Sequence, residues 1–257
     1  MKRFFLNTKT EFLKSKGTAA VWLTILAALF IPVIYAMVCL ERPDVMVKKI
    51  NSDPWMAFLR MNWKNVAAVI LPLYCVLMTS LIIQIEYRNN TWKQVYTLPR
   101  KFADVFFSKF IVIHSFLIGF ILLFSSAIII SGLSVARLNP AYHLLSKDIP
   151  WMMLLIIASR IYLGLFAITI VQYWLSLRFK NFVVSLGIGM GLWITGIVLM
   201  DWDKIVYYPY MYSTFMFFTD FDKNPETLVQ LSLCSIISSV LFLTLSFRDI
   251  YLLPERG

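Results

Sequence analysis

Six long apolar stretches alternate with shorter polar segments along the 257-residue chain. A helix needs about 20 predominantly apolar residues to cross the roughly 30 Å hydrocarbon core of a bilayer. Each stretch is long enough; they cover residues 18–40, 65–85, 110–133, 150–177, 182–200 and 228–247. The pattern therefore predicts an all-α membrane protein in which residues 1–257 form one transmembrane domain with six spans. Pro32 and Pro72 predict irregularities in the first two spans.

The composition leaves no room for a separate soluble domain. Hydrophobic residues make up 60% of the chain and charged residues 15%, whereas a soluble domain of this size needs a more charged surface. The first stretch follows a basic segment and lacks a small-residue cleavage site. We therefore expect an uncleaved first span rather than a signal peptide.

The basic residues gather on one side of the predicted membrane. Of the 24 Lys and Arg residues, 14 lie before the first span, between the second and third, between the fourth and fifth, or after the sixth. Because basic loops stay in the cytoplasm, this distribution places both termini there. The net charge of +10 thus orients the protein, and we expect no nucleic-acid partner.

Residues 2–16 carry an amphipathic pattern. Phe5, Leu6, Phe12 and Leu13 fall on one helical stripe and the lysines elsewhere. Such a pattern is typical of a helix lying in the cytoplasmic headgroup region. A disordered basic tail is the alternative.

Residues 201–227 are acidic at both ends and rich in Tyr, Phe and Met between them. A water-exposed loop would not have this composition, so we expect short helices that re-enter the outer leaflet. Irregular backbone at that depth requires a cover of protein. The alternative is an aromatic cap packed over the helix ends.

Two features inside the spans stand out. Arg160 lies ten residues into the fourth span, about 15 Å deep, and the spans contain no acid to pair with it. A charge at that depth usually faces protein or a wet cavity, so Arg160 is a candidate for the substrate path or for an internal polar anchor. Gly187 and Gly191, one turn apart in the fifth span, predict close helix packing.

The chain lacks the motifs of membrane enzymes and of ATPases. It contains no HExxH, GxSxG or GxxxxGK[ST] sequence, so we expect neither catalysis nor bound cofactors or metals in this chain. The spans also lack the midplane carboxylates typical of ion-driven carriers. Energy for transport would then have to come from another subunit.

The polar segment 86–109 between the second and third spans is long enough to dock such a subunit. Trp92 and Tyr96 share one helical face, and Leu98-Pro99 interrupts the helix because proline disfavours helix at the preceding residue. The pattern predicts a short amphipathic helix, a corner and a second helix leading into the third span. An interfacial loop held by its aromatic residues and by phospholipid charge is the alternative.

The stretch EYRNNTWKQVYTLPRKFADVFFSKF resembles the E…TW…LP…K pattern after the second span of type-2 ABC export permeases, nearest the bacitracin- and lantibiotic-resistance group. The resemblance implies six spans, an interfacial helix before the first, a coupling helix at 86–109 and a re-entrant hairpin before the sixth. It also implies separate cassette ATPase subunits that hold ATP and Mg, and a second identical or paralogous permease. The expected coupling residues are Glu86, Thr91, Trp92, Tyr96, Leu98, Pro99 and Lys109.

Together these features predict that the chain is a permease subunit of an ATP-driven exporter. We expect it in the bacterial cytoplasmic membrane, in contact with membrane lipids. Its expected cargo is an amphipathic or lipid-like molecule such as an antimicrobial peptide. Two alternatives stay open: a scaffold or sensor subunit that does not transport, and a carrier that works without ATP.

Overall fold

A computed structural model describes residues 2–50, 53–88, 101–220 and 224–252. The described residues are helical, with no strand among them. The elements are α1 (Lys2–Ser15), α2 (Ala19–Glu41), α3 (Pro43–Ile50), α4 (Pro54–Asn65), η1 (Val66–Ile70), α5 (Leu71–Arg88), α7 (Phe102–Leu138), η2 (Pro140–Tyr142), η3 (Leu144–Ser146), α8 (Trp151–Arg178), α9 (Phe182–Val198), η4 (Ile205–Tyr207), η5 (Pro209–Met211), α10 (Tyr212–Phe218) and α11 (Pro225–Leu252).

Within the described residues, five helices are long and apolar enough to cross a membrane: Ala19–Glu41, Pro54–Tyr87, Phe102–Leu138, Trp151–Arg178 and Pro225–Leu252. The stretch expected to form the fifth of six spans is the shorter helix α9, which has 17 residues and a length of about 25 Å. The all-helical prediction is confirmed, and the apolar helices confirm a multi-pass membrane protein.

The second long helix begins well before the predicted start of the second span. Residues 54–87 form one helix of 34 residues, about 51 Å long. Much of the polar stretch between the first two predicted spans is therefore helical, as α3 and α4. Pro72 lies just after the π-helix η1. Because proline lacks an N–H and its ring clashes with the carbonyl four residues earlier, a wider turn relieves the conflict.

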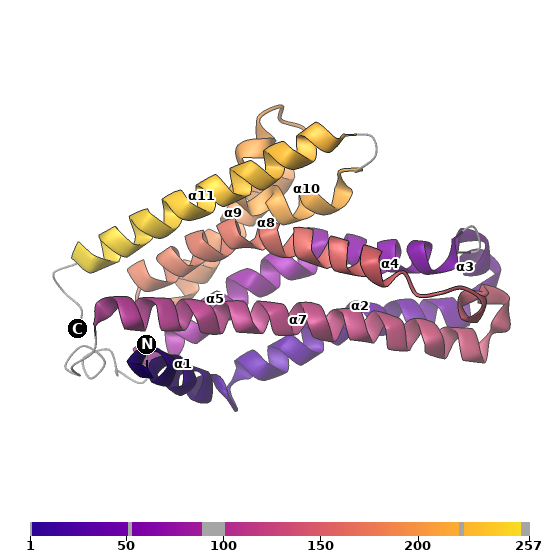
Figure 1. Cartoon of the computed structure of the whole chain (residues 1–257), viewed down its shortest axis with the longest axis horizontal. Helices are drawn as coiled ribbons and strands as arrows, with labels where there is room; N and C mark the ends of the chain where they lie inside the picture. The colour runs from indigo at the N-terminus through magenta and orange to yellow at the C-terminus, as the bar shows by residue number, and fades with distance from the viewer. Residues whose placement is uncertain (1, 51–52, 89–100, 221–223, 253–257) are drawn as a thin grey trace.

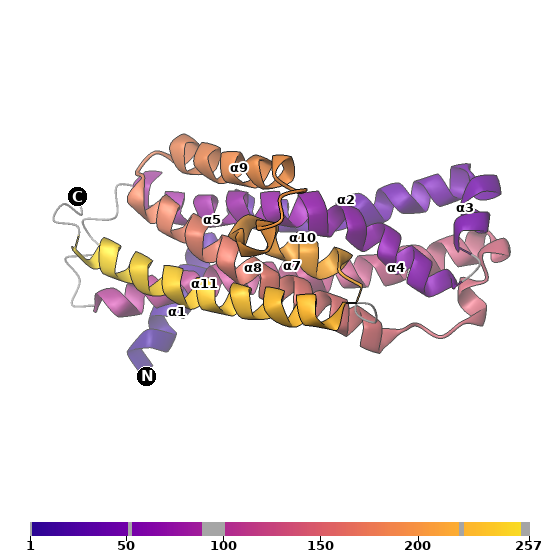
Figure 2. The ribbon, with the colours of Figure 1, turned by 90° about the horizontal axis from the view of Figure 1, so that it is seen from above.

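The long helices run side by side in an elongated bundle (Figures 1 and 2). The helix α1 and the last turns of α11 lie at one end, together with the start of α7, whereas α3 lies at the opposite end. We call the first the terminal end and the second the far end.

The described part of the aromatic segment at 201–227 packs into the bundle instead of extending from it. Tyr210, Tyr212 and Met216 are buried, and α10 lies against α8. A methyl group built on Gly164 of α8 would come within 2.6 Å of the Cα atom of Ser213. The backbones therefore meet closely, which requires glycine at this position. The cover of protein that a re-entrant segment needs is present.

Large apolar side chains cover much of the outer surface. On α2, Leu26 and Met37 are exposed, and on α11, Ile237 and Val240 are exposed. Many exposed large apolar side chains on one domain indicate contact with lipid or with another protein. The bundle thus has the surface expected of a domain that is solvated by hydrocarbon.

The glycine contact gives a stability prediction. Gly164→Ala forces the backbones of α8 and α10 apart and should lower the free energy of unfolding by about 1–3 kcal/mol. Gly119→Ala in α7, where a methyl group would meet no atom within 4 Å, should be neutral. Melting temperatures of the two variants in the same detergent check this; equal shifts would contradict the close packing.

Candidate functional site

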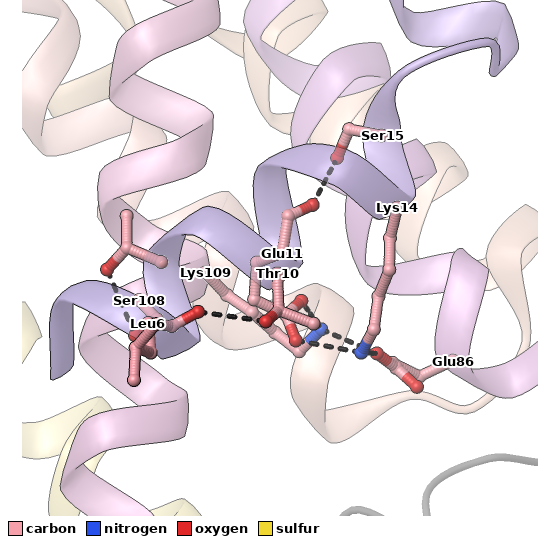
Figure 3. Close-up of polar contacts among 9 residues, drawn as sticks. Leu6, Thr10, Glu11, Lys14, Ser15, Glu86, Ser108 and Lys109 are labelled. Atoms are coloured by element: carbon pink, nitrogen blue, oxygen red, sulfur yellow. Dashed lines mark hydrogen bonds and ion pairs between the residues drawn. The ribbon is translucent and has the colours of Figure 1, made fainter. Parts of the chain in front are cut away.

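Four charged side chains from three helices meet at the terminal end (Figure 3): Glu11 and Lys14 of α1, Glu86 of α5 and Lys109 of α7. The Nζ atom of Lys109 lies 3.0 Å from Oε1 of Glu86 and also donates to Oε2 of Glu11. The Nζ atom of Lys14 lies 2.7 Å from Oε1 of Glu86 and 2.9 Å from Oε1 of Glu11. Each lysine therefore bridges both carboxylates. We call this group the ionic cluster.

Among the described residues, the ionic cluster is mostly buried and contains equal numbers of positive and negative charges. The side chains of Glu86 and Lys109 are each 1% exposed and that of Glu11 is 7% exposed, whereas Lys14 keeps 33%. Two positive charges face two negative ones. Balance is needed because desolvating an ion costs several kcal/mol, and only a close partner of opposite sign offsets that cost. Removing Glu86 or Lys109, the two most buried members, would leave the remaining buried charges without one of their close partners.

Lys14 stays protonated in this environment. Its partial burial lowers the pKa of the ammonium group, but the hydrogen bonds to Glu11 and Glu86 outweigh burial and raise the pKa above its usual value of 10.5. A raised lysine pKa contributes stability that is complete below pH 10.5 and is lost as pH rises through the folded value. The contribution of Lys14 is therefore constant over the physiological range.

The sequence of α1 brings its polar side to the bundle. Asn7, Glu11 and Ser15 are spaced by four residues and are buried, whereas Phe5 on the other side is 72% exposed. Phe12 stacks on Phe116 of α7, with 5.8 Å between ring centroids. The helix thus turns its polar stripe to protein and most of its apolar stripe outward, the reverse of a soluble amphipathic helix.

Two of the predicted coupling residues, Glu86 and Lys109, meet in the ionic cluster although they are 23 positions apart. The other five lie outside the described residues: Thr91, Trp92, Tyr96, Leu98 and Pro99. Our reading of the sequence missed Glu11 and the role of Lys14. A signal was there, because Glu11 is the only acid in the first 40 residues and shares a helical stripe with two other polar residues.

Gly187 and Gly191 make no close contact with the described residues of this chain, so helix packing at this pair stays a prediction. A methyl group on either would meet no described atom within 4 Å. The close approaches of α9 occur instead at Gly189, against the side chain of Gln172, and at Gly196, against Met211. The spacing of Gly187 and Gly191 alone does not say which face of α9 meets a neighbour.

A second buried polar group lies around Gln172 of α8. Its Nε2 atom donates to Ser80 Oγ at 2.9 Å and to the Ser185 carbonyl at 3.1 Å, and its Oε1 atom accepts from the Tyr210 hydroxyl at 3.3 Å. These uncharged hydrogen bonds join α5, α8, α9 and η5. We assign them a structural role, because a polar atom buried in an apolar bundle must be paired.

Arg160 is half-buried on α8, ten residues into the helix, and is not a member of the ionic cluster. It shares a helical face with Met153 and Ile157, which precede it by seven and three positions. Among the described residues, no group of three or more His, Cys, Asp or Glu side chains is placed to hold a metal ion.

The ionic cluster gives a second stability prediction. Lys109→Met removes the most buried lysine from two buried carboxylates, which among the described residues then keep the partly exposed Lys14, and should lower the free energy of unfolding by about 3–5 kcal/mol. The matched change Lys14→Met removes the more exposed lysine and should cost about 1 kcal/mol. Thermal unfolding of both variants in one detergent measures the order. Equal losses would contradict the buried bridge through Lys109.

The family model described as ABC-2 family transporter protein matches residues 8–196. The matched range includes all four members of the ionic cluster and covers more than half of the chain. No curated protein and no solved structure matches the chain. The apolar helices and the breadth of the family match lead to one conclusion: the chain belongs to the ABC-2 family of transporter proteins, as a permease component of an ABC transporter.

Proposed function

We propose that this permease is the membrane subunit of an exporter driven by separate cassette ATPase subunits, and that the segment between α5 and α7 docks them. Members of the family are membrane components that work with ATPase subunits. The observation that carries the proposal is the ionic cluster. It joins the residues that flank residues 89–100, Glu86 on one side and Lys109 on the other, to each other and to α1.

The cluster makes α1, α5 and α7 respond as one unit at the terminal end. A force on residues 89–100 acts on the end of α5 and the start of α7. Because separating the buried pair would cost several kcal/mol, a shift of the segment moves the helices together instead of breaking the contact. Nucleotide-driven movement of the ATPase subunits would thereby reach the spans.

In the same proposal the chain has six spans, with α9 as the fifth. Its length of about 25 Å falls a few ångströms short of the hydrocarbon core, which a locally thinned bilayer accommodates at modest cost. Both termini lie in the cytoplasm, and residues 201–227 re-enter the outer leaflet. The exposed Phe5 and Leu13 of α1 contact headgroups and acyl chains.

The wider assembly contains a second identical or paralogous permease, surrounded by lipids of the bacterial cytoplasmic membrane. The exposed apolar faces of α2 and α11 support contacts with lipid or with that second chain. The cargo is amphipathic or lipid-like, as in the bacitracin- and lantibiotic-resistance group that the 86–109 segment resembles. ATP and Mg belong to the ATPase partner.

Co-purification tests the docking segment. Tagged permease extracted from its host in mild detergent should bring down a cassette ATPase in stoichiometric amount. Trp92→Ala removes a large contact side chain and should reduce the recovered ATPase and its hydrolysis activity at least tenfold. The matched control is Trp22→Ala on the exposed side of α2, which should leave both unchanged.

Melting temperatures separate lost docking from lost folding, since Trp92→Ala should melt within a few degrees of the wild type. A permease that purifies alone, under conditions that preserve other membrane complexes, would contradict ATP coupling and favour the scaffold or carrier alternatives. Equal ATPase recovery with Trp92→Ala and with the wild type would instead rule out Trp92 as a docking residue.

Reporter fusions test the proposed orientation. A fluorescent protein fused after Lys180 or at the C-terminus should fluoresce, because it folds in the cytoplasm, and alkaline phosphatase at these points should be inactive. A fusion after His143, in the connection between α7 and α8, should show the reverse. Phosphatase activity at the C-terminus would contradict an even number of spans.

A further inference from the structure

A cavity of about 260 Å³ opens between α4, α8 and α10. Among the described residues, it is lined by Arg60 and Lys64 of α4, Met153 and Ile157 of α8, and residues 216–220. It is distinct from the ionic cluster, because it lies on parts of α4 and α8 toward the far end of the bundle. The proposed function leaves this cavity unassigned.

Among the described residues, the charged lining of the cavity is predominantly basic. Arg60 and Lys64 are four residues apart and therefore share one face of α4, and both are exposed. The acid in the described lining is Asp220. Two cations against one carboxylate favour an anionic group, and guanidinium and ammonium groups together suit a phosphate.

The cations lie at headgroup depth on the far side. Lys64 is 23 residues before Tyr87 on the same continuous helix, which places it about 34 Å along the helix axis. The hydrocarbon core is roughly 30 Å thick. With the terminal end at the cytoplasmic surface, Lys64 and Arg60 therefore stand at the outer headgroup layer.

The rest of the described lining is mostly apolar and continues toward the membrane interior. Met153 and Ile157 line the cavity from α8, and Met216 closes it from α10. Arg160 is on the same face of α8, one turn deeper. A ligand would thus meet positive charge at headgroup level and apolar side chains below it, the order of groups in a lipid.

The volume limits what can be enclosed. Sites for drug-sized ligands measure roughly 300–1,000 Å³, so a cavity of about 260 Å³ holds a head group and the first carbons of a chain but no whole peptide. A cationic amphipathic peptide would also meet two like charges. Size and charge both argue for a smaller, anionic group.

We infer that this cavity binds the phosphate head of an anionic lipid-like molecule whose hydrocarbon tail stays in the outer leaflet. The inference deepens the proposed function, on which its membrane orientation rests, by naming the chemical class of the cargo. Arg60 and Lys64 bind the phosphate, and Met153, Ile157 and Met216 contact the first carbons of the tail.

Photolabelling tests the inference on the full-length protein in nanodiscs of phosphatidylcholine. The probe is a dodecyl phosphate that carries a diazirine in its chain. It should label peptides of α8 or α10, and the double change Arg60→Gln with Lys64→Gln should reduce labelling at least tenfold. The matched control, Lys48→Gln with Lys49→Gln, removes two exposed cations of α3 and should leave labelling unchanged.

Two tryptophan variants, one that fills the cavity and one that does not, test the site without changing its charge. Ile157→Trp should block labelling, whereas Leu155→Trp, at an exposed position of the same helix, should not. Unlabelled dodecyl phosphate should compete with the probe, and dodecyltrimethylammonium should not. Inorganic phosphate should need at least a hundredfold higher concentration than dodecyl phosphate, because it lacks the tail.

Unchanged labelling in both the Gln double variant and Ile157→Trp would overturn the inference. Competition by dodecyltrimethylammonium as strong as that by dodecyl phosphate would overturn the choice of an anionic head. Inorganic phosphate competing as well as dodecyl phosphate would show a site for free phosphate and overturn the lipid-like ligand. The assay needs no ATPase, so its failure is distinguishable from failure of the co-purification that tests the proposed function.

Discussion

The arrangement of the terminal end depends on one constraint: charges that leave water must be paired. Glu86 and Lys109 are almost fully buried, and each carries a charge that the apolar bundle cannot solvate. Their pairing fixes the end of α5 against the start of α7. Glu11 and Lys14 of α1 add one charge of each sign to this pair. The four charges therefore place α1 on the bundle, and the outward direction of its apolar side follows.

One continuous helix links the two ends of the molecule. Residues 54–87 carry Arg60 and Lys64 beside the cavity and Glu86 in the ionic cluster. Between them lies the π-helix η1, whose Ala67 carbonyl accepts a hydrogen bond from Thr214 Oγ1 of α10 at 3.2 Å. A π-helix is a local irregularity often found at functional sites. Here it joins the helix that reaches the proposed ATPase surface to the segment that closes the cavity.

The helical class and most long helices could be predicted from the sequence, because burial in hydrocarbon requires about 20 apolar residues whatever their identity. The helix α1 could also be predicted from its amphipathic stripe. The ionic cluster could be predicted only in part. Motif and position indicated Glu86 and Lys109, but pairing across three helices depends on packing that a linear pattern does not contain.

Two further points at which the sequence pattern and the structure differ in detail have physical causes. The apolar pattern places the start of the second span at residue 65, whereas the helix begins at Pro54, because α4 remains helical beyond the apolar stretch. The i, i+4 pair Gly187 and Gly191 stays a prediction for helix packing, and among the described residues the close contacts of α9 fall at Gly189 and Gly196. Spacing identifies a face that permits contact, and only the fold decides which face receives a neighbour.

The most direct test of the account is photo-cross-linking in intact membranes of the host. Benzoylphenylalanine placed at position 92 samples the proposed ATPase surface, and the same residue at position 22 samples the exposed side of α2. The account predicts an adduct with a cassette ATPase subunit, identified by mass spectrometry, from position 92 and none from position 22. Adducts only with lipid or with the permease itself at position 92 would contradict the account.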